Sequence, residues 1–155
     1  MDKENKHHLD QSLGFIINII ALSMRTALEE ALKPFDVSTT QWLVLQGIAE
    51  SEEAIQTDIG KITHLDNATI TRHLDKLESV ELLQRTRIEN DRRVQMVQLT
   101  DKGRELLPKI TEVATQINAR ALKGLNASKI ANFIEILHLI NDNLTELHGD
   151  QLTQE

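Results

Sequence analysis

The sequence predicts a mainly helical fold with about six helices and one small β-hairpin. Apolar residues recur at helical spacing through most of the chain. Residues 83–88 and 93–99, by contrast, are rich in β-branched residues and in alternating apolar and polar residues, and the polar turn 89–92 separates them. The chain has 155 residues, of which 40% are hydrophobic and 26% charged, as is ordinary for a globular protein. We therefore expect a single folded domain spanning residues 1–155.

The first helix is expected from Leu9 to Leu32 and ends before Pro34, because proline disrupts the interior of a helix. Its apolar residues keep a helical period at Leu9, Leu13, Ile16, Ile17, Ile20, Met24, Ala27, Leu28 and Ala31, and Ile19 and Leu22 widen the face. A helix this apolar around its circumference needs more than one partner. We expect it to pack on its own core and on another subunit.

Three further helices are expected before the hairpin. One begins at Ser38, which forms a capping-box pattern with Gln41. A short helix covers residues 56–63, and Asp66 is the N-cap of the next. In that helix Ile70, Leu74 and Leu77 recur at helical spacing and can point inward. The residues left on or near its outer face are Asn67, Thr71, Arg72, Asp75 and Lys76.

The second hairpin strand has an imperfect phase. Val94 and Met96 fall on one face, while Val97 and Leu99 fall on the other. A bulge and burial on both faces are therefore open alternatives.

Two long helices complete the chain. Thr100 and Asp101 open the first, in which Pro108 removes one hydrogen bond and is expected to produce a bend. The last helix is expected at about residues 128–148, where apolar residues again recur at helical spacing.

Positive charge is concentrated in the middle of an acidic chain. The net charge is -7, yet residues 61–104 carry nine Lys and Arg against seven Asp and Glu. The short helix, the turn and the amphipathic helix after Asp66 make a helix-turn-helix pattern, whose second helix fits the DNA major groove. The pattern favours double-stranded DNA as the partner.

Arg72 is the strongest base-contact candidate, because its planar fork matches guanine O6 and N7, a pairing worth roughly 1 to 3 kcal/mol of discrimination. Bases or phosphates can be contacted by Asn67, Thr69 and Thr71, and Lys76 adds charge. For a lone helix, a solvated face with Arg72 and Lys76 paired to Asp75 or Glu78 would be the simpler interpretation. The coincidence of helix pair, hairpin and locally reversed charge favours DNA.

The hairpin tip carries Asp91, Arg92 and Arg93. Arginine on a protruding tip can enter a narrow A·T-rich minor groove, where the potential is most negative. A salt bridge from Arg93 to Asp91 would instead stiffen the turn, and the two roles are compatible. We expect the hairpin to act as a wing.

The sequence resembles the multiple-antibiotic-resistance regulator (MarR) family of winged-helix repressors from about Leu9 to Leu147. The motifs that carry the resemblance are Thr40-Gln41-Trp42-Leu43-Val44-Leu45, then Ala68-Thr69-Ile70-Thr71-Arg72-His73-Leu74-Asp75-Lys76-Leu77-Glu78, Asp91-Arg92-Arg93, and Val97-Gln98-Leu99-Thr100-Asp101-Lys102-Gly103. Glu81 and His64 depart from the family's usual glycines, so each turn either avoids a positive φ or tolerates strain.

The resemblance implies a homodimer in which the first and the last two helices interlock. It also implies recognition by residues 66–78, minor-groove contact by Arg93 with Asp91 bracing the tip, and repression relieved by a small aromatic or anionic effector. An effector pocket could be lined by Phe15, Met24, Arg25, Trp42 and Ile110, although apolar residues at helical spacing are more commonly core.

Several other classes of function are disfavoured. The chain has no cysteine, which excludes disulfides and thiolate zinc sites, and its six histidines are too dispersed to predict a metal site. No phosphate-binding glycine motif or nucleophile–base pair indicates an enzyme, and no cofactor is expected. The polar N-terminus and short apolar runs predict neither export nor a membrane span, so a cytoplasmic location is expected.

The expected organisation is a winged-helix DNA-binding lobe at residues 36–99, with dimerisation helices at 9–34 and 101–148. Such a dimer would bind a pseudo-palindrome whose half-sites lie about one helical turn apart. The alternative is a helical dimeric adaptor that acts on another regulator without binding DNA.

Overall fold

The computed structural model describes the backbone of residues 9–51, 54–88 and 91–152, and the side chains of these ranges except 88, 91–94 and 147–152. The chain divides into two compact units, residues 1–117 and 118–155.

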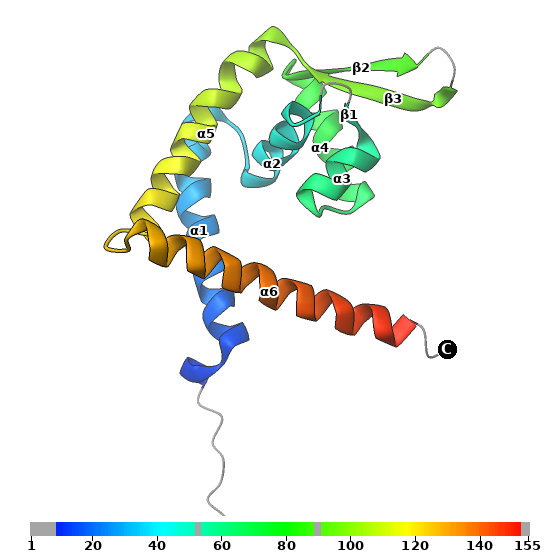
Figure 1. The fold of residues 1–155 in the computed structure, drawn as a ribbon. Coiled ribbons are helices and arrows are strands. Elements are labelled where there is room, and N and C mark those ends of the chain that lie inside the picture. The colour runs from blue at the N-terminus through cyan, green and yellow to red at the C-terminus, as the bar shows by residue number, and fades with distance from the viewer. Residues whose placement is uncertain (1–8, 52–53, 89–90, 153–155) are drawn as a thin grey trace, which may run out of the picture. The chain divides into compact units, whose positions relative to one another are not determined.

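The predicted fold class is confirmed: the described residues form six α-helices and a three-stranded antiparallel sheet of order β1-β3-β2 (Figure 1). In chain order the elements are η1 (Leu9–Gln11), α1 (Leu13–Leu32), η2 (Lys33–Phe35), α2 (Thr39–Ala49), β1 (Ala54–Ile55), α3 (Gln56–Thr63), α4 (Asn67–Ser79), β2 (Leu83–Ile88), β3 (Asp91–Leu99), α5 (Asp101–Ala121) and α6 (Ala127–Leu152).

Helix starts follow the local capping signals. Gln41 donates its backbone N–H to Ser38 Oγ at 3.2 Å, and Ser38 donates its own N–H to Gln41 Oε1 at 2.7 Å, which completes the predicted capping box. Asp66 Oδ1 accepts the Thr69 N–H at 2.8 Å at the start of α4. Thr100 Oγ1 accepts the Gly103 N–H at 3.1 Å at the start of α5. Each cap satisfies an N–H that a helix terminus leaves without a partner.

Three expected boundaries differ from the structure. The first helix does not run unbroken from Leu9, because a 3-10 turn is followed by Ser12 in an extended conformation before α1 begins. Asp91 and Arg92 lie in β3 rather than in a turn. The last helix begins one residue earlier than expected, at Ala127, and extends to Leu152.

The sheet contains both of the alternatives that the phase of the second hairpin strand left open, an irregular register and burial on both faces. Its register shifts between Arg87 and Ile88, which is the irregularity that a bulge produces. The short strand β1, which the sequence did not predict, pairs with Met96 and Val97 along the edge of β3 opposite β2. Val97 is buried and Met96 is half-buried, so both faces of β3 are partly covered.

One hydrophobic core holds the first unit together, with side chains from the C-terminal end of α1, from α2, α3, α4 and α5, and from the sheet. Its largest fully buried side chains are Leu32, Leu45, Ile59, Ile70, Leu74, Leu77, Leu83, Ile110, Val44 and Val97. These residues fix α3 and α4 against the sheet, because a close-packed interior resists displacement.

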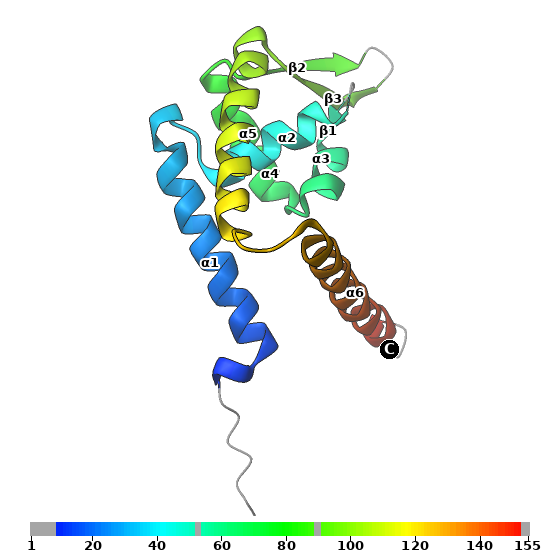
Figure 2. The ribbon, with the colours of Figure 1, turned by 60° about the vertical axis from the view of Figure 1, so that its left-hand side comes forward.

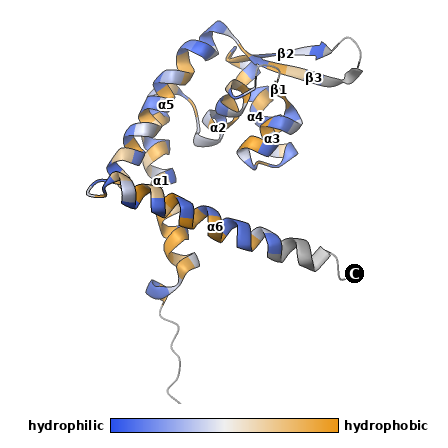
Figure 3. Cartoon of the chain, in the orientation of Figure 1, coloured by the Kyte–Doolittle hydropathy of each residue, from blue (hydrophilic) through white to orange (hydrophobic). Residues whose placement is uncertain are grey.

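The N-terminal part of α1 takes no part in that core. Only Leu28 and Leu32 of α1 are buried, and apolar side chains remain exposed along the rest of the helix, which Figure 3 shows as a largely orange segment. Those exposed in α1 are Leu13, Phe15, Ile16, Ile17, Ile19, Ile20 and Leu22, and in α6 of the second unit they are Phe133, Ile134, Ile136, Leu137, Leu139 and Leu144. None of the described helices is long and apolar enough to cross a membrane.

Candidate nucleic-acid interface

α3 and α4 form a helix-turn-helix. α3 ends at Thr63, and the next residue, His64, has a left-handed φ of 55° and donates its N–H to Gly60 O at 2.9 Å. Two residues later Asp66 caps α4, so the turn between the helices is short. In both Figure 1 and Figure 2 the hairpin of β2 and β3 extends past this helix pair, which is the arrangement of a wing beside a recognition helix.

α4 presents the outward face that its sequence predicts. Ile70, Leu74 and Leu77 are buried, and the residues exposed opposite them are Asn67, Thr71, Arg72, Asp75 and Lys76. Among the described side chains, Arg72 and Lys76 make no ion pair. The alternative interpretation, in which Asp75 or Glu78 pairs with them, does not hold for these side chains, because both carboxylates bind Arg85 instead. Two cations are thus left for an external anion.

Arg85 ties the wing to the recognition helix. Its Nη2 pairs with Asp75 and lies 2.9 Å from Glu78 Oε2, and its Nε donates to the same Glu78 oxygen at 3.0 Å. Burial works to lower the pKa of Arg85, but the hydrogen bond that Arg85 donates to Asp75 and the charges of Glu78 and Asp75 outweigh it and raise that pKa above its ordinary value. Arg85 therefore stays charged while fixing β2 against α4.

The two threonines of α4 use their hydroxyls within the protein. Thr69 Oγ1 donates to Asp66 Oδ2 at 2.7 Å, and Thr71 Oγ1 donates to Asn67 O at 2.8 Å. The backbone and side-chain hydrogen bonds from Thr69 lower the pKa of Asp66 below 3.8. Neither hydroxyl retains a proton for a phosphate, so a donor role for them stays unsupported.

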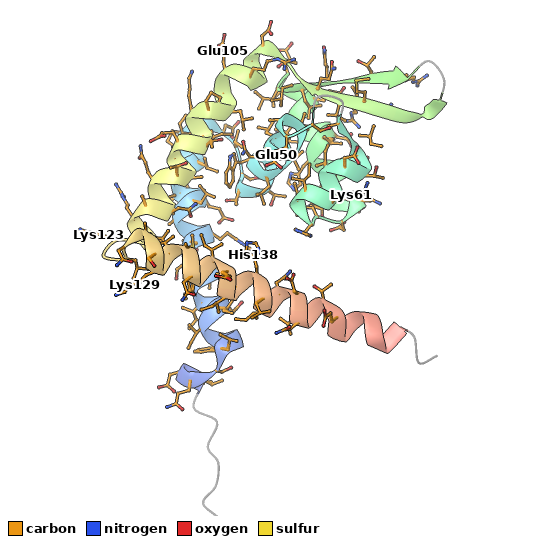
Figure 4. All side chains as sticks on the ribbon, in the orientation of Figure 1. Glu50, Lys61, Glu105, Lys123, Lys129 and His138 are labelled. Carbon is orange, nitrogen blue, oxygen red and sulfur yellow. The ribbon has the colours of Figure 1, made fainter. Side chains whose placement is uncertain are left out.

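The wing candidates Asp91, Arg92 and Arg93 belong to β3, but their side chains lie outside the described residues. Lys61, which Figure 4 labels on α3, is a further cation, and it precedes α4 by a few residues. Its Nζ lies 3.2 Å from Asp58 Oδ1, and its side chain is 78% exposed, so the ion pair leaves it largely solvated.

The five effector-pocket candidates lie in different environments within one chain. Phe15 and Arg25 are exposed on α1, Met24 is half-buried, and Ile110 is fully buried in the core. Trp42 packs against that core, with its Nε1 donating to Thr111 Oγ1 at 3.4 Å. None of the five lines the cavities at α3 and the sheet, at α1 and α2, or at α2 and β3. In the described part of the chain no cluster of His, Asp and Glu could hold a metal ion.

Comparison with known proteins places this interface in a family. A family model described as MarR family matches residues 37–94, from before α2 into β3. A MarR variant from E. coli solved with operator DNA is 26% identical, with a TM-score of 0.76, over 83% of this chain and 92% of that chain. The chain thus resembles the MarR family in sequence over residues 37–94 and in fold over most of its length. The general role that this likeness supports is that of a transcriptional regulator.

Two further solved structures share the MarR fold with this chain. BpsR from Bordetella bronchiseptica, whose DNA binding is regulated by 6-hydroxynicotinic acid, is 23% identical over 88% of this chain and 97% of that chain, with a TM-score of 0.81. CouR from Rhodococcus jostii, solved with p-coumaroyl-CoA, is 24% identical over 86% and 94%, with a TM-score of 0.78. The predicted winged-helix resemblance is confirmed.

Sequence reasoning missed two residues of the interface. Arg85 was not singled out, because its carboxylate partners lie seven and ten positions away on another element. Gln56 begins α3, and its Nε2 donates to Asn67 O at 3.0 Å and to Thr71 Oγ1 at 2.8 Å. The only signal for Gln56 in the sequence was that a polar residue stands at the start of the helix-turn-helix. Its hydrogen-bond partners, 11 and 15 positions away, could be identified only from the fold.

Proposed function

We propose that this protein is a homodimeric repressor that binds double-stranded DNA sequence-specifically and releases it in response to a small ligand. The observation that carries the proposal is the outward face of α4, where Arg72 and Lys76 make no ion pair among the described side chains. Phosphate neutralisation by such cations supplies most non-specific DNA affinity, and an arginine fork supplies base choice. DNA binding in turn supports a cytoplasmic, non-catalytic role.

The contacts are divided between two elements. Arg72 would read a base edge from α4, with Asn67 and Thr69 beside it and Lys76 adding charge, while Arg92 and Arg93, with Asp91, would act in the minor groove from the wing. The Arg85 pairs support joint action, since they hold the wing strand β2 against α4.

Dimerisation is supported by apolar surface that one chain leaves exposed on α1 and α6. Helices 9–34 and 101–148 would form the dimer lobe and residues 36–99 the DNA-binding lobe. The two recognition helices of such a dimer would face half-sites about 34 to 36 Å apart on a pseudo-palindrome.

A ligand-responsive role is supported by the two structural relatives that bind or respond to aromatic anions, 6-hydroxynicotinic acid in BpsR and p-coumaroyl-CoA in CouR. Phe15, Met24, Arg25, Trp42 and Ile110 remain the candidates for such a site. Trp42 is the single tryptophan, so its fluorescence reports on titration with phenolic acids.

Selection of bound duplexes from random fragments tests the DNA-binding proposal. We expect recovery of paired half-sites, and Arg72→Ala should lose roughly 1 to 3 kcal/mol of discrimination at one base pair. Arg93→Ala should weaken binding to all duplexes and flatten its salt dependence.

Lys109→Ala on α5 removes an exposed charge away from α4 and serves as the control. A folded protein that retains no duplex at low salt would instead support the adaptor alternative.

A further inference from the structure

Gln56 joins the two helices of the helix-turn-helix at the N-terminal end of α4. Its Nε2 donates to Asn67 O at 3.0 Å and to Thr71 Oγ1 at 2.8 Å. A backbone carbonyl only accepts hydrogen bonds, so the orientation of the Gln56 amide is fixed, with its nitrogen toward α4. Its Oε1 has no hydrogen-bond partner among the described residues and keeps both lone pairs.

The Thr71 hydroxyl is constrained in the same way. Its one proton is donated to Asn67 O, and one lone pair accepts from Gln56 Nε2. The hydroxyl can therefore accept one more hydrogen bond but cannot donate any. Gln56 and Thr71 together form a corner that offers acceptors and no donors.

That chemistry excludes some partners on DNA and selects others. Phosphate oxygens are acceptors, so they gain nothing from this corner. In the major groove, guanine presents only acceptors, and thymine presents an acceptor and a methyl group, whereas adenine N6 and cytosine N4 donate. Recognition helices contact base edges with their N-terminal residues, where Asn67 and Thr71 stand.

We propose that Gln56 is a specificity-determining residue that, with Thr71, accepts a hydrogen bond from an exocyclic amino group, adenine N6 or cytosine N4, on the contacted strand. Because each Watson–Crick pair carries one such group in the major groove, this contact would distinguish A·T from T·A or C·G from G·C. This inference rests on the proposed DNA-binding function. The adjacent Arg72 offers only donors, so neighbouring base positions would be read with opposite hydrogen-bond polarity.

The test starts from the site that the wild-type dimer selects. Each position of one half-site is replaced in turn by all four base pairs, and binding is measured for wild type, Gln56→Met, Thr71→Val and Thr71→Ser. We expect wild type to prefer, by about fivefold at one position, the pair that places the amino group on the contacted strand over the reversed pair, the effect of a single net hydrogen bond. Gln56→Met and Thr71→Val should lose that preference, and Thr71→Ser, which keeps the hydroxyl, should retain it.

Analogue bases distinguish the two amino groups. Purine in place of adenine removes N6, and a pyrimidinone in place of cytosine removes N4, so only the analogue of the base that is read should reduce wild-type binding about fivefold. Gln116→Met makes the same chemical change at an exposed position of α5 and should leave every base preference unaltered. Thermal unfolding of each variant confirms that the fold is intact.

The outcomes separate this inference from the function on which it rests. Wild-type protein that selects a site while Gln56→Met keeps every preference would overturn the role of Gln56 and leave DNA binding standing. Wild-type binding that neither amino-free analogue weakens at the affected base pair would overturn it as well. Wild-type protein that binds no duplex would overturn both.

Discussion

Glu81 adopts a backbone conformation that favours glycine. Its φ is 61°. Two hydrogen bonds close α4 at this point: Glu81 donates its N–H to Glu78 O, and Leu82 donates its N–H to Leu77 O. This pair of bonds defines a Schellman motif, in which the residue after the helix is left-handed. The turn therefore tolerates strain rather than avoiding a positive φ, and His64 with φ 55° does the same at the end of α3.

Replacing Glu81 with glycine should raise the free energy of unfolding by about 1 kcal/mol, because a left-handed conformation costs an L-residue about that much and glycine nothing. The Glu81 side chain is exposed, so little else is lost. Urea denaturation measures the change. Glu105→Gly, in the exposed interior of α5, is the matched control and should lower stability by about 1 kcal/mol. Equal effects of the two substitutions would refute the argument.

Sequence predicted best those features whose cause lies within a few residues. Ser38 and Asp66 signal their helices because their hydrogen-bond partners are three positions away. The requirement for glycine at position 103, by contrast, comes from a distant segment, since an added Cβ would collide with the backbone oxygen of Leu82. Such contacts between distant segments cannot be inferred from spacing, and the same holds for β1.

At the scale of elements, the joint between α4 and β2 depends on ion pairs that the core only partly shields. Arg85 has a side chain 17% exposed, whereas Glu78 is 42% exposed. A pair of this kind contributes more than one between two solvated side chains, because water screens it less.

A double-mutant cycle with Arg85→Met and Glu78→Gln should give a coupling energy of about 1 kcal/mol in the free energy of unfolding. The exposed pair of Lys61 and Asp58 provides the control cycle, with a coupling of at most about 0.5 kcal/mol. Equal couplings in the two cycles would mean that Arg85 does not fix the wing strand.

His73 makes the stability of α4 depend on pH. Burial, and then the charge of Arg72, lower the pKa of His73 below 6.5. The unfolded chain thus binds a proton more readily than the folded chain, and the free energy of unfolding should fall as pH drops from about 6.5 through the lowered pKa. His73→Gln should flatten this part of the profile, measured by urea denaturation between pH 5 and about 8. An unchanged slope would assign the dependence to other groups.

For the whole molecule, the amount of apolar surface left exposed is the decisive property. A single chain buries Leu28 and Leu32 of α1 but leaves Ile16 at 40% and Ile20 at 48% exposed. Contiguous apolar patches of this kind on a soluble protein mark interaction surfaces. The same property appears on α6, where Phe133 is 44% and Leu139 is 60% exposed.

If these faces join two subunits, a charge placed among them should separate the dimer. Ile16→Glu would bury a carboxylate without a partner at the interface, which costs several kcal/mol, so the dimer dissociation constant should rise by at least about a hundredfold. Asn18→Glu introduces the same charge on α1 two positions along, where the native residue is already polar, and should leave the dimer intact. Sedimentation equilibrium measures both constants. Operator affinity should fall with dimer content, because one chain can occupy a single half-site. An Ile16→Glu protein that remains dimeric at the wild-type dissociation constant would exclude this face of α1 from the subunit interface.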